Sequence, residues 1–299
     1  MMEQQKTAFV AIVGRANAGK SSLMNQLLGQ KVVIVSDKPQ TTRTRIMGVL
    51  TEGVNQFVFI DTPGFHKPKT TLGENMIKAV GSGMDDVELC ILVADCTKEI
   101  SPIEEELIAK FRQRKLPAIL VLNKIDLLKD KKELIHQITE YSARFDFAAV
   151  IPVSAMTGDG VETVKEEILP FAQNGIHMFD EDMLTDQPER LLAAEMIREK
   201  LLRLLDKEIP HGIAVVIERF HTREDDDIID MEATIFCEKE SHKGIIIGKG
   251  GAMLKRAASY ARQDLEQFFE CKVNLKCWVK VKEDWRNRQG LIHSFGLDS

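Results

Sequence analysis

Short hydrophobic runs alternate with amphipathic stretches in the N-terminal half of the chain. Five runs consist almost entirely of apolar residues and lie at 8–14, 56–61, 88–95, 117–124 and 148–155. Continuous hydrophobicity of this length is typical of strands buried on both faces of a parallel sheet. The stretches between them, such as KSSLMNQLLG and IEEELIAKFRQRK, have the apolar spacing of helices. The alternation predicts right-handed βαβ crossovers and an α/β fold, a mostly parallel sheet with helices on both faces.

The alternation of strands and helices breaks at residues 172–188, where AQNGIHMFDEDMLTDQP combines Gly, Pro and clustered acids. Such a composition is typical of a connection between domains. We therefore predict an N-terminal domain at 1–173, a linker at 174–188 and a C-terminal domain with a tail at 189–299.

The C-terminal domain begins with a helical pattern at 188–208, in which Pro188 suits the first turn. Two strand patterns follow at 212–220 and 228–238, and the acidic stretch between them indicates a solvated turn. A short helix at 241–246, a glycine turn, a long helix at 252–269 and a strand at 272–281 complete the domain. The order α-β-β-α-α-β predicts an α+β fold.

The first strand ends in GRANAGKS, which matches the phosphate-loop pattern G-x-x-x-x-G-K-[ST] between a strand and a helix. Glycines let the backbone approach closely, so that N–H groups and the positive end of the helix can hold phosphate oxygens. Lys20 would neutralise these oxygens, and Ser21 offers a hydroxyl to Mg²⁺. The predicted phosphate loop comprises Gly14, Arg15, Ala16, Asn17, Ala18, Gly19, Lys20, Ser21 and Ser22.

The sequence NKID at 123–126 indicates that the bound base is guanine. It ends a strand, where ligands of open α/β sheets bind. The Asp126 carboxylate can accept two hydrogen bonds from guanine, whereas adenine would leave it unpaired. A backbone N–H of Ser154-Ala155-Met156, after the next strand, would bind the guanine oxygen. The predicted base site comprises Asn123, Lys124, Asp126, Ser154, Ala155 and Met156.

Two further segments are expected to contact the γ-phosphate and Mg²⁺. Asp61 ends a strand and is placed to hold Mg²⁺ through water, and the Gly64 N–H would contact the γ-phosphate. In KPQTTRTRIMG, residues 38–48, we expect Thr42 rather than Thr41 to complete the metal ligands Ser21, Thr42 and Asp61. The first segment comprises Asp61, Thr62, Pro63, Gly64 and Phe65, and the second, the switch loop, includes Gln40, Thr41, Thr42, Arg43 and Thr44.

Phe65 stands where Ras-like GTPases have a glutamine that orients the attacking water. A phenyl ring cannot polarise water, so hydrolysis needs a positioned backbone group, a cation or a partner. We therefore predict a GTPase with slow intrinsic turnover.

Composition and charge limit the class of protein. A chain of 299 residues with 44% hydrophobic and 29% charged residues is typical of a two-domain globular protein. Neither a membrane-spanning run nor an export signal is visible, and five cysteines without a C-x-x-C pair indicate reduced thiols, so we expect a cytoplasmic protein. The net charge is −6, yet residues 239–288 carry 12 Lys and Arg against 6 Asp and Glu. This basic segment can hold a polyanion.

A second glycine turn, Gly248-Lys249-Gly250-Gly251, lies between two predicted helices inside the basic segment. Gly-x-x-Gly between helices is the loop with which KH domains clamp about four nucleotides of single-stranded backbone. Trp285 and Arg286 in the tail could stack on a base or hold a phosphate; a docking role for Trp285 is an equal alternative. The predicted RNA contacts are Ile247, Gly248, Lys249, Gly250, Gly251, Lys255, Arg256, Trp285 and Arg286.

One G domain with GRANAGKS, KPQTTRTR, DTPGFHKP, NKID and SAM, followed by one KH domain with IIIGKGG, resembles the bacterial Era GTPases over essentially the whole chain. The resemblance implies a P-loop G domain, a type II KH domain, and a role in ribosome assembly. It implies binding to the 3′ end of small-subunit ribosomal RNA and to the small ribosomal subunit under the control of GTP. DNA is not an expected partner.

The resemblance also implies peripheral contact with the inner face of the cell membrane. Relatives in the wider superfamily hold a K⁺ ion beside the phosphates with an asparagine that matches Asn17. One difference is that the family's Pro-Asn-Val is Ala16-Asn17-Ala18 here, which removes a rigid φ from the loop.

Two other functions are consistent with the same motifs. The KH-like domain could dock to a protein or membrane partner under GTP control, with RNA incidental. Alternatively, the chain could be an RNA chaperone with a vestigial nucleotide site. The intact Lys20, Ser21, Asp61 and Asp126 argue against a vestigial site.

Overall fold

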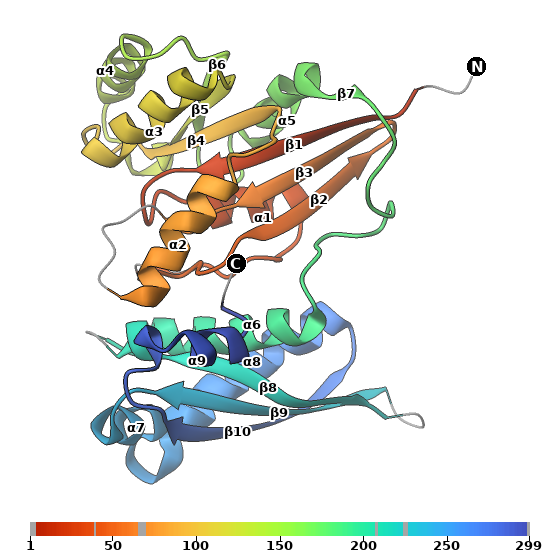
Figure 1. Ribbon diagram of the computed structural model, residues 1–299, viewed down its shortest axis with the longest axis vertical. Helices are drawn as coiled ribbons and strands as arrows, with labels where there is room; N and C mark the ends of the chain where they lie inside the picture. The colour runs from red at the N-terminus through yellow and green to blue at the C-terminus, as the bar shows by residue number, and fades with distance from the viewer. Residues whose placement is uncertain (1–3, 39, 65–69, 207–208, 224–226, 298–299) are drawn as a thin grey trace.

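The computed structural model describes residues 4–38, 40–64, 70–206, 209–223 and 227–297. Two domains follow one another along the long axis of the molecule, the G domain above and the KH domain below (Figure 1). None of the helices in the described ranges is long and apolar enough to cross a membrane.

The G domain is built on a sheet whose main path has the order β2-β3-β1-β4-β5-β6, and β7 pairs with β1. β1, β3, β4, β5 and β6 are parallel, as their hydrophobic runs predicted, whereas β2 and β7 are antiparallel to their neighbours. β2 was not predicted, and its first three residues lie in the region assigned to the switch loop. The strands are β1 (Lys6–Val13), β2 (Ile46–Glu52), β3 (Asn55–Asp61), β4 (Leu89–Asp95), β5 (Ala118–Asn123), β6 (Ala149–Val153) and β7 (Gln173–Asn174).

Helices cover both faces of this sheet, and each face has its own hydrophobic core. One core includes α1 and α5, and the other includes α3 and α4. α3 begins with a capping box, in which Ser101 and Glu104 satisfy each other's backbone N–H groups. The helices are α1 (Lys20–Leu28), α2 (Thr71–Ser82), α3 (Pro102–Arg114), α4 (Lys131–Ser142) and α5 (Val161–Ile168), with 3₁₀ turns η1 (Ile125–Leu127) and η2 (Leu169–Phe171).

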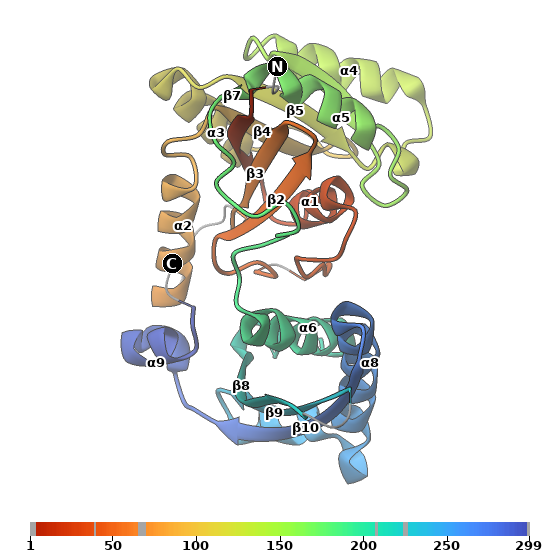
Figure 2. The same cartoon turned by 90° about the vertical axis from the view of Figure 1, so that its right-hand side faces the viewer.

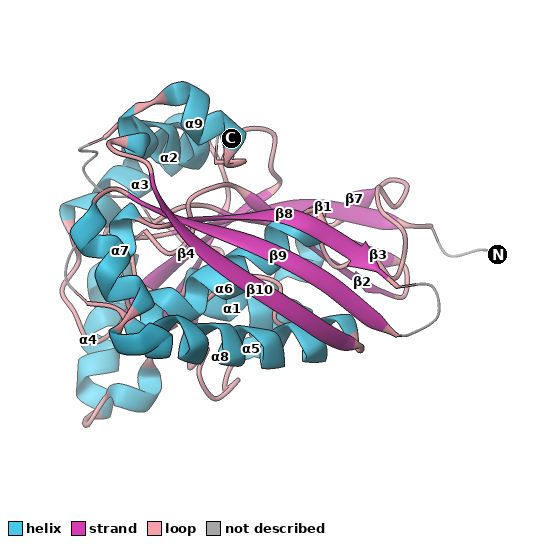
Figure 3. Cartoon of the chain, turned by 90° about the horizontal axis from the view of Figure 1, so that it is seen from below, coloured by secondary structure: helices cyan, strands magenta, loops and turns pink. Residues whose placement is uncertain are grey.

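The KH domain has a three-stranded sheet of order β10-β9-β8, with α6 and α8 against one face (Figure 3). β8 and β9 are antiparallel, and β10 is parallel to β9. The elements are α6 (Glu189–Leu204), η3 (Pro210–Gly212), β8 (Ala214–Thr222), β9 (Ile228–Cys237), α7 (Glu240–Ile247), η4 (Lys249–Gly251), α8 (Ala252–Phe269), β10 (Lys272–Val281), η5 (Trp285–Asn287) and α9 (Gln289–Ser294).

The connection between the domains follows the edge of the G-domain sheet. The Val49 N–H of β2 donates to the Leu184 carbonyl at 2.9 Å, and the Thr185 hydroxyl donates to the Met47 carbonyl at 2.7 Å. At the other side of the molecule, α9 lies beside the lower end of α2 (Figure 2). The two domains are therefore in contact through more than their connecting chain.

Candidate nucleotide and nucleic-acid sites

The turn between β1 and α1 can be built only with glycine at two positions. Gly14 and Gly19 have φ angles of +149° and +101°, and Asn17 between them has a φ of +62°. A Cβ on Gly14 would lie 2.3 Å from the Val93 carbonyl oxygen, and one on Gly19 would lie 2.0 Å from the Asn123 amide nitrogen. The loop is therefore closed tightly against the ends of β4 and β5, with its N–H groups at the start of α1.

Lys20 is buried at the base of this loop. Its ammonium group donates to the Gly14 carbonyl at 3.2 Å and to the Arg15 carbonyl at 3.1 Å. Burial lowers the pKa of Lys20, and the nearby Asp61 carboxylate opposes that shift. The backbone carbonyls thus hold the lysine across the loop, where it can neutralise phosphate oxygens.

Three side chains with oxygen atoms converge beside Lys20. The Ser21 hydroxyl donates to Asp61 Oδ2 at 2.8 Å and lies 3.0 Å from Thr42 Oγ1. Burial raises the pKa of Asp61 to about 6, against the opposing effects of Lys20 and the two hydroxyls. The other oxygen, Asp61 Oδ1, is buried without a hydrogen-bond partner among the described residues. Two hydroxyls and an unsatisfied carboxylate fit Mg²⁺, which prefers hard oxygen ligands.

A cavity of about 410 Å³ opens beside Ser21 and Thr42. It brings together residues from the phosphate loop, the switch loop and the end of β5. The predicted residues in its lining are Ala16, Asn17, Gly19, Lys20, Ser21, Ser22, Gln40, Thr41, Thr42, Gly64 and Lys124, and those that the sequence analysis missed are Ile34, Val35, Ser36, Asp37 and Lys98. The missed residues have no motif of their own. Their position before the switch loop could have indicated Ile34, Val35, Ser36 and Asp37, whereas Lys98 lies after β4.

The guanine motifs are tied to the phosphate loop by side-chain hydrogen bonds. The Asn123 amide donates to the Ala18 carbonyl at 2.8 Å and accepts from the Ala155 N–H at 2.9 Å. The Ser154 hydroxyl donates to Asp126 Oδ1 at 2.6 Å. Asn123 therefore fixes the spacing between the phosphate and base ends of the site, and the exposed Asp126 is oriented by its serine.

Asp95, at the end of β4, is a residue that the sequence analysis missed. The Lys124 ammonium donates to its Oδ2 at 2.8 Å. Burial alone would raise the pKa of Asp95, but hydrogen bonds from Lys124 and Thr97 lower it to about 2. The ionised Asp95 thereby holds the lysine of the NKID motif beside the cavity. Met156 is 84% exposed and available as an apolar surface at the base end.

The segment after β3 lies directly against the phosphate loop. A Cβ on Gly64 would be 2.7 Å from the Cα atom of Ala16, which leaves room for glycine alone. The Thr62 hydroxyl donates to the Ile12 carbonyl at 3.0 Å, and Pro63 is buried. Phe65, which we predicted to follow in the site, lies outside the described residues.

Arg43 points away from the nucleotide cavity and into the KH domain. Its guanidinium donates to the Ile213 carbonyl at 2.6 Å and to the His211 carbonyl at 2.9 Å. Burial lowers the pKa of Arg43, and the positive charge of Arg198 adds to this effect. Thr44 beyond it is half-buried. The predicted switch loop therefore divides: Gln40, Thr41 and Thr42 face the cavity, and Arg43 faces the second domain.

The second glycine turn stands at the surface between α7 and α8. Gly248, Gly250 and Gly251 have φ angles of +74°, +59° and +81°, a conformation that favours glycine. A Cβ on Gly248 would lie 2.7 Å from the Met253 Cβ, whereas Gly250 and Gly251 face open space. A backbone ligand can therefore approach this turn closely. The exposed cations around it are Lys249, Lys255 and Arg256.

The three isoleucines before the turn differ in burial. Ile247, a predicted RNA contact, is half-buried, Ile246 is in the core and Ile245 is 49% exposed. The guanidinium of Arg256 lies 5.6 Å from the Tyr260 ring centroid, so this arginine is partly held by a neighbouring aromatic.

Comparisons with known proteins agree with this pairing of sites. Residues 9–124 match the family described as 50S ribosome-binding GTPase, and residues 208–286 match the KH domain. The chain is 49% identical to GTPase Era of Clostridioides difficile, over 98% of this chain and 99% of that protein. It is 47% identical to GTPase Era of Ruminiclostridium cellulolyticum over 97% of each.

The chain belongs to the Era GTPase family. It is a GTPase with a P-loop G domain and a C-terminal KH domain, as the motifs predicted.

A solved structure of Era in complex with MgGDPNP and nucleotides 1506–1542 of 16S ribosomal RNA superposes with a TM-score of 0.94. That protein is 37% identical and covers 99% of this chain, with 100% of its own length matched. A variant of Aquifex aeolicus Era bound to GDP.AlF4⁻ matches with the same TM-score, identity and coverage. The chain thus has the same architecture as these two relatives.

One tail residue that we predicted to contact RNA, Trp285, is corrected by the structure of this chain, whereas Arg286 stays a prediction. Trp285 is completely buried and donates its ring N–H to the Gly212 carbonyl at 2.9 Å. Its ring also lies edge-on to Phe295, with centroids 5.4 Å apart, so no face remains for a base. Arg286 donates to Glu238 at 2.6 Å. The alternative, a docking tryptophan, describes the position of Trp285.

Proposed function

We propose that this chain binds and hydrolyses GTP with Mg²⁺ and binds the 3′ end of small-subunit ribosomal RNA during assembly of the small ribosomal subunit. The observation that carries the proposal is the presence, in one chain, of a phosphate loop joined to the NKID motif through Asn123 and of an exposed Gly-Lys-Gly-Gly turn. The solved Era complex with MgGDPNP and a 16S ribosomal RNA segment, which matches over 99% of this chain, supports it.

The residues proposed for the nucleotide are those of the phosphate loop, the NKID and SAM motifs and Gly64. Ser21, Thr42 and Asp61 would hold Mg²⁺, which when bound neutralises charge on the β- and γ-phosphates. The protein's part is to orient the phosphates through the loop N–H groups and Lys20. The three hydroxyl and carboxylate groups that converge in the site support this assignment.

The residues proposed for RNA are the glycine turn with Ile247, Lys249, Lys255 and Arg256, and Arg286 in the tail. The exposure and positive charge of Lys249, Lys255 and Arg256 suit single-stranded backbone phosphates. We also propose a G domain at 1–173, a linker at 174–188, a KH domain at 189–299 and a cytoplasmic location. Peripheral membrane contact remains a prediction, and no observation favours a protein or membrane partner in place of RNA.

The test is the binding of a fluorescent single-stranded RNA that carries the 3′ end of 16S ribosomal RNA. The full chain is titrated with GDP and with GDPNP, as wild type and as the Gly248→Asp, Gly251→Asp double variant. Gly290→Asp is a matched control, because its Cβ would meet open space on α9. We expect the wild type to bind RNA more tightly with GDPNP than with GDP, and its affinity for RNA to fall steeply with salt. The double variant should lose RNA binding, whereas Gly290→Asp should keep it. Equal RNA binding by the double variant would refute the assignment of RNA binding to the glycine turn.

A further inference from the structure

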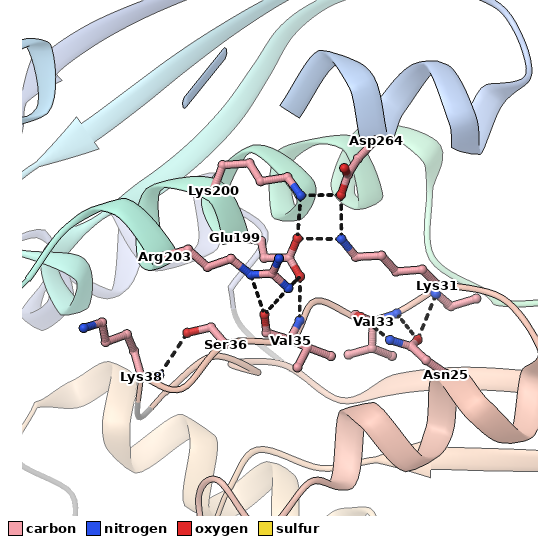
Figure 4. A network of polar contacts seen from close by, with 11 residues as sticks. Asn25, Lys31, Val33, Val35, Ser36, Lys38, Glu199, Lys200, Arg203 and Asp264 are labelled. Atoms are coloured by element: carbon pink, nitrogen blue, oxygen red, sulfur yellow. Dashed lines mark hydrogen bonds and ion pairs between the residues drawn. The ribbon is translucent and has the colours of Figure 1, made fainter. Parts of the chain in front are cut away.

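The first helix of the KH domain, α6, lies along the segment that leads into the switch loop. The Glu199 carboxylate accepts from the Val35 N–H at 2.9 Å and from the Lys31 ammonium at 2.5 Å. Arg203, one turn later, donates to the Val35 carbonyl at 3.0 Å. Figure 4 shows both polar groups of Val35 facing this helix. Because Val35 also lines the nucleotide cavity, the KH domain fixes part of the cavity wall.

This contact is buried and carries charge. Glu199 is completely buried, and Lys200 and Asp264 of α8 complete the network around Lys31 (Figure 4). Burial alone would raise the pKa of Glu199, but hydrogen bonds from Lys31 and Val35 lower it. The carboxylate is therefore ionised at neutral pH and its partners are held in place, since a buried charge is costly without them.

Arg198 reaches the switch loop itself. Its side chain is 1% exposed and pairs with Glu195 of the same helix through two nitrogens, at 2.7 and 2.6 Å. The same guanidinium donates to the carbonyl of Thr41. That carbonyl belongs to the peptide group that joins Thr41 to Thr42. A hydrogen bond to it therefore restrains the backbone of the residue whose hydroxyl faces Ser21 and Asp61.

Thr42 is thus held from both sides by contacts with the other domain. The residue before it accepts a hydrogen bond from Arg198, and the residue after it, Arg43, donates to two carbonyls of the KH domain. Both guanidinium groups are buried. Displacing Thr42 from the metal site would require these contacts to break or the KH domain to move with the loop.

We propose that Arg198 of the KH domain is a positioning residue for the Mg²⁺ site of the G domain, acting through the peptide group of Thr41 and Thr42. Glu199 and Arg203 support it by fixing Val35. The inference rests on the proposed role of Thr42 as a metal ligand. Because a GDP state does not need Thr42 at the metal, the contact favours Mg²⁺–GTP over GDP.

The test compares nucleotide affinities in the full chain without RNA. Arg198→Met removes the hydrogen bond and keeps the side-chain length, Arg198→Lys keeps a donor, and Arg190→Met is the matched control at an exposed position of the same helix. Affinities for GDPNP and GDP are measured by displacement of a fluorescent nucleotide, at several Mg²⁺ concentrations. We expect R198M to weaken GDPNP binding about tenfold, the value of one charge-assisted hydrogen bond. GDP binding should change less than about twofold, and R198K should restore part of the loss.

Equal weakening of GDP and GDPNP by R198M, or no weakening of either, would overturn the proposal. If R198M fails to fold by circular dichroism, Arg203→Met takes its place, because this side chain is half-exposed and donates to Val35. A selective loss of GDPNP affinity in R203M supports the proposal, and unchanged affinity overturns it. Thr42→Ala tests the premise: if T42A binds GDPNP normally, the metal assignment fails and the proposal fails with it. RNA is absent throughout, so a failure of RNA binding would not affect the result.

Discussion

Replacing Phe295 by alanine should release both the C-terminal segment and a helix of the G domain. The Phe295 ring stacks on Phe236 of β9 at 4.6 Å and lies edge-on to Trp285. Leu72 and Met76 of α2 belong to the same hydrophobic cluster, and both are buried almost completely. The cluster therefore joins the open face of the KH sheet to the helix that follows the Gly64 segment.

The size of the effect follows from burial. Phe295 is 8% exposed, and truncating a buried phenylalanine to alanine costs about 3–5 kcal/mol. We take the lower end, about 3 kcal/mol, because a site near the surface can partly collapse around the gap. α9 is short, so we expect local opening of the cluster rather than global unfolding. At about 1.4 kcal/mol per factor of ten, amide exchange in the cluster should accelerate roughly a hundredfold.

Hydrogen–deuterium exchange read by mass spectrometry measures this change in α9 and α2 separately. The matched control is Phe220→Ala, since Phe220 contacts Phe269 at 5.6 Å on the opposite face of the same sheet. We expect F295A to accelerate exchange in both helices and F220A to accelerate it only within the KH domain. Unchanged exchange of α2 in F295A, or equal acceleration in F220A, would refute a hydrophobic connection between the domains.

Three further predictions concern the nucleotide site and the domain contact. Asp126→Asn should weaken GTP binding at least about a hundredfold and improve binding of xanthosine triphosphate, because an amide donates where the carboxylate accepts; competition binding measures both. Asn17→Ala should abolish any excess of GTP turnover in K⁺ over Na⁺, and an excess that persists would remove Asn17 as the cation ligand. The pKa of Glu199 is lower in the folded than in the unfolded chain, so the ionised carboxylate stabilises the fold at pH values above the unfolded pKa. This stabilisation is lost as the pH falls from the unfolded pKa through the folded pKa. Between pH 7 and 4 the unfolding temperature of Glu199→Gln should therefore fall less than that of the wild type.

The nucleotide pocket could be predicted from the sequence because each of its motifs follows a hydrophobic run. Parallel strands bring their carboxyl ends to one edge of the sheet, so the phosphate loop, Asp61 and Asn123 had to meet there. The sequence did not show that Asn123 joins the loop to the base site by two hydrogen bonds. Such contacts depend on side-chain direction, which spacing alone does not define.

The elements that were missed are those whose stability comes from neighbours. β2 is an edge strand with polar residues at its end, and it is completed by β3 and by residues 184–185. α9 has only six residues, too few to form a helix alone, and its Ile292 is buried against the KH sheet and α2. The local hydrophobic pattern is weak in β2 and α9, and tertiary contacts stabilise both elements.

Arg43 and Trp285 show most clearly why the domain contact could not be predicted. Each is a residue type that binds phosphates or bases. The sequence placed Arg43 in the switch loop and left an RNA contact and a docking role as equal alternatives for Trp285. In the structure the guanidinium of Arg43 lies 5.6 Å from the Trp285 ring centroid, and its carbonyl partners are about 170 positions away along the chain. A local sequence pattern does not predict a contact between residues so far apart along the chain.

The two segments that flank the γ-phosphate position are therefore each anchored in the KH domain at a different place. The switch loop is held at Thr41 and Arg43, and the helix that follows Gly64 is held at Leu72 and Met76. A rotation of the KH domain must break at least one anchor, since the hydrogen bonds tolerate little change in distance and the cluster little exposure. A nucleotide that favours one arrangement of these segments must then change the affinity of the KH domain for its ligand. By thermodynamic linkage, that ligand changes the affinity for the nucleotide by the same factor.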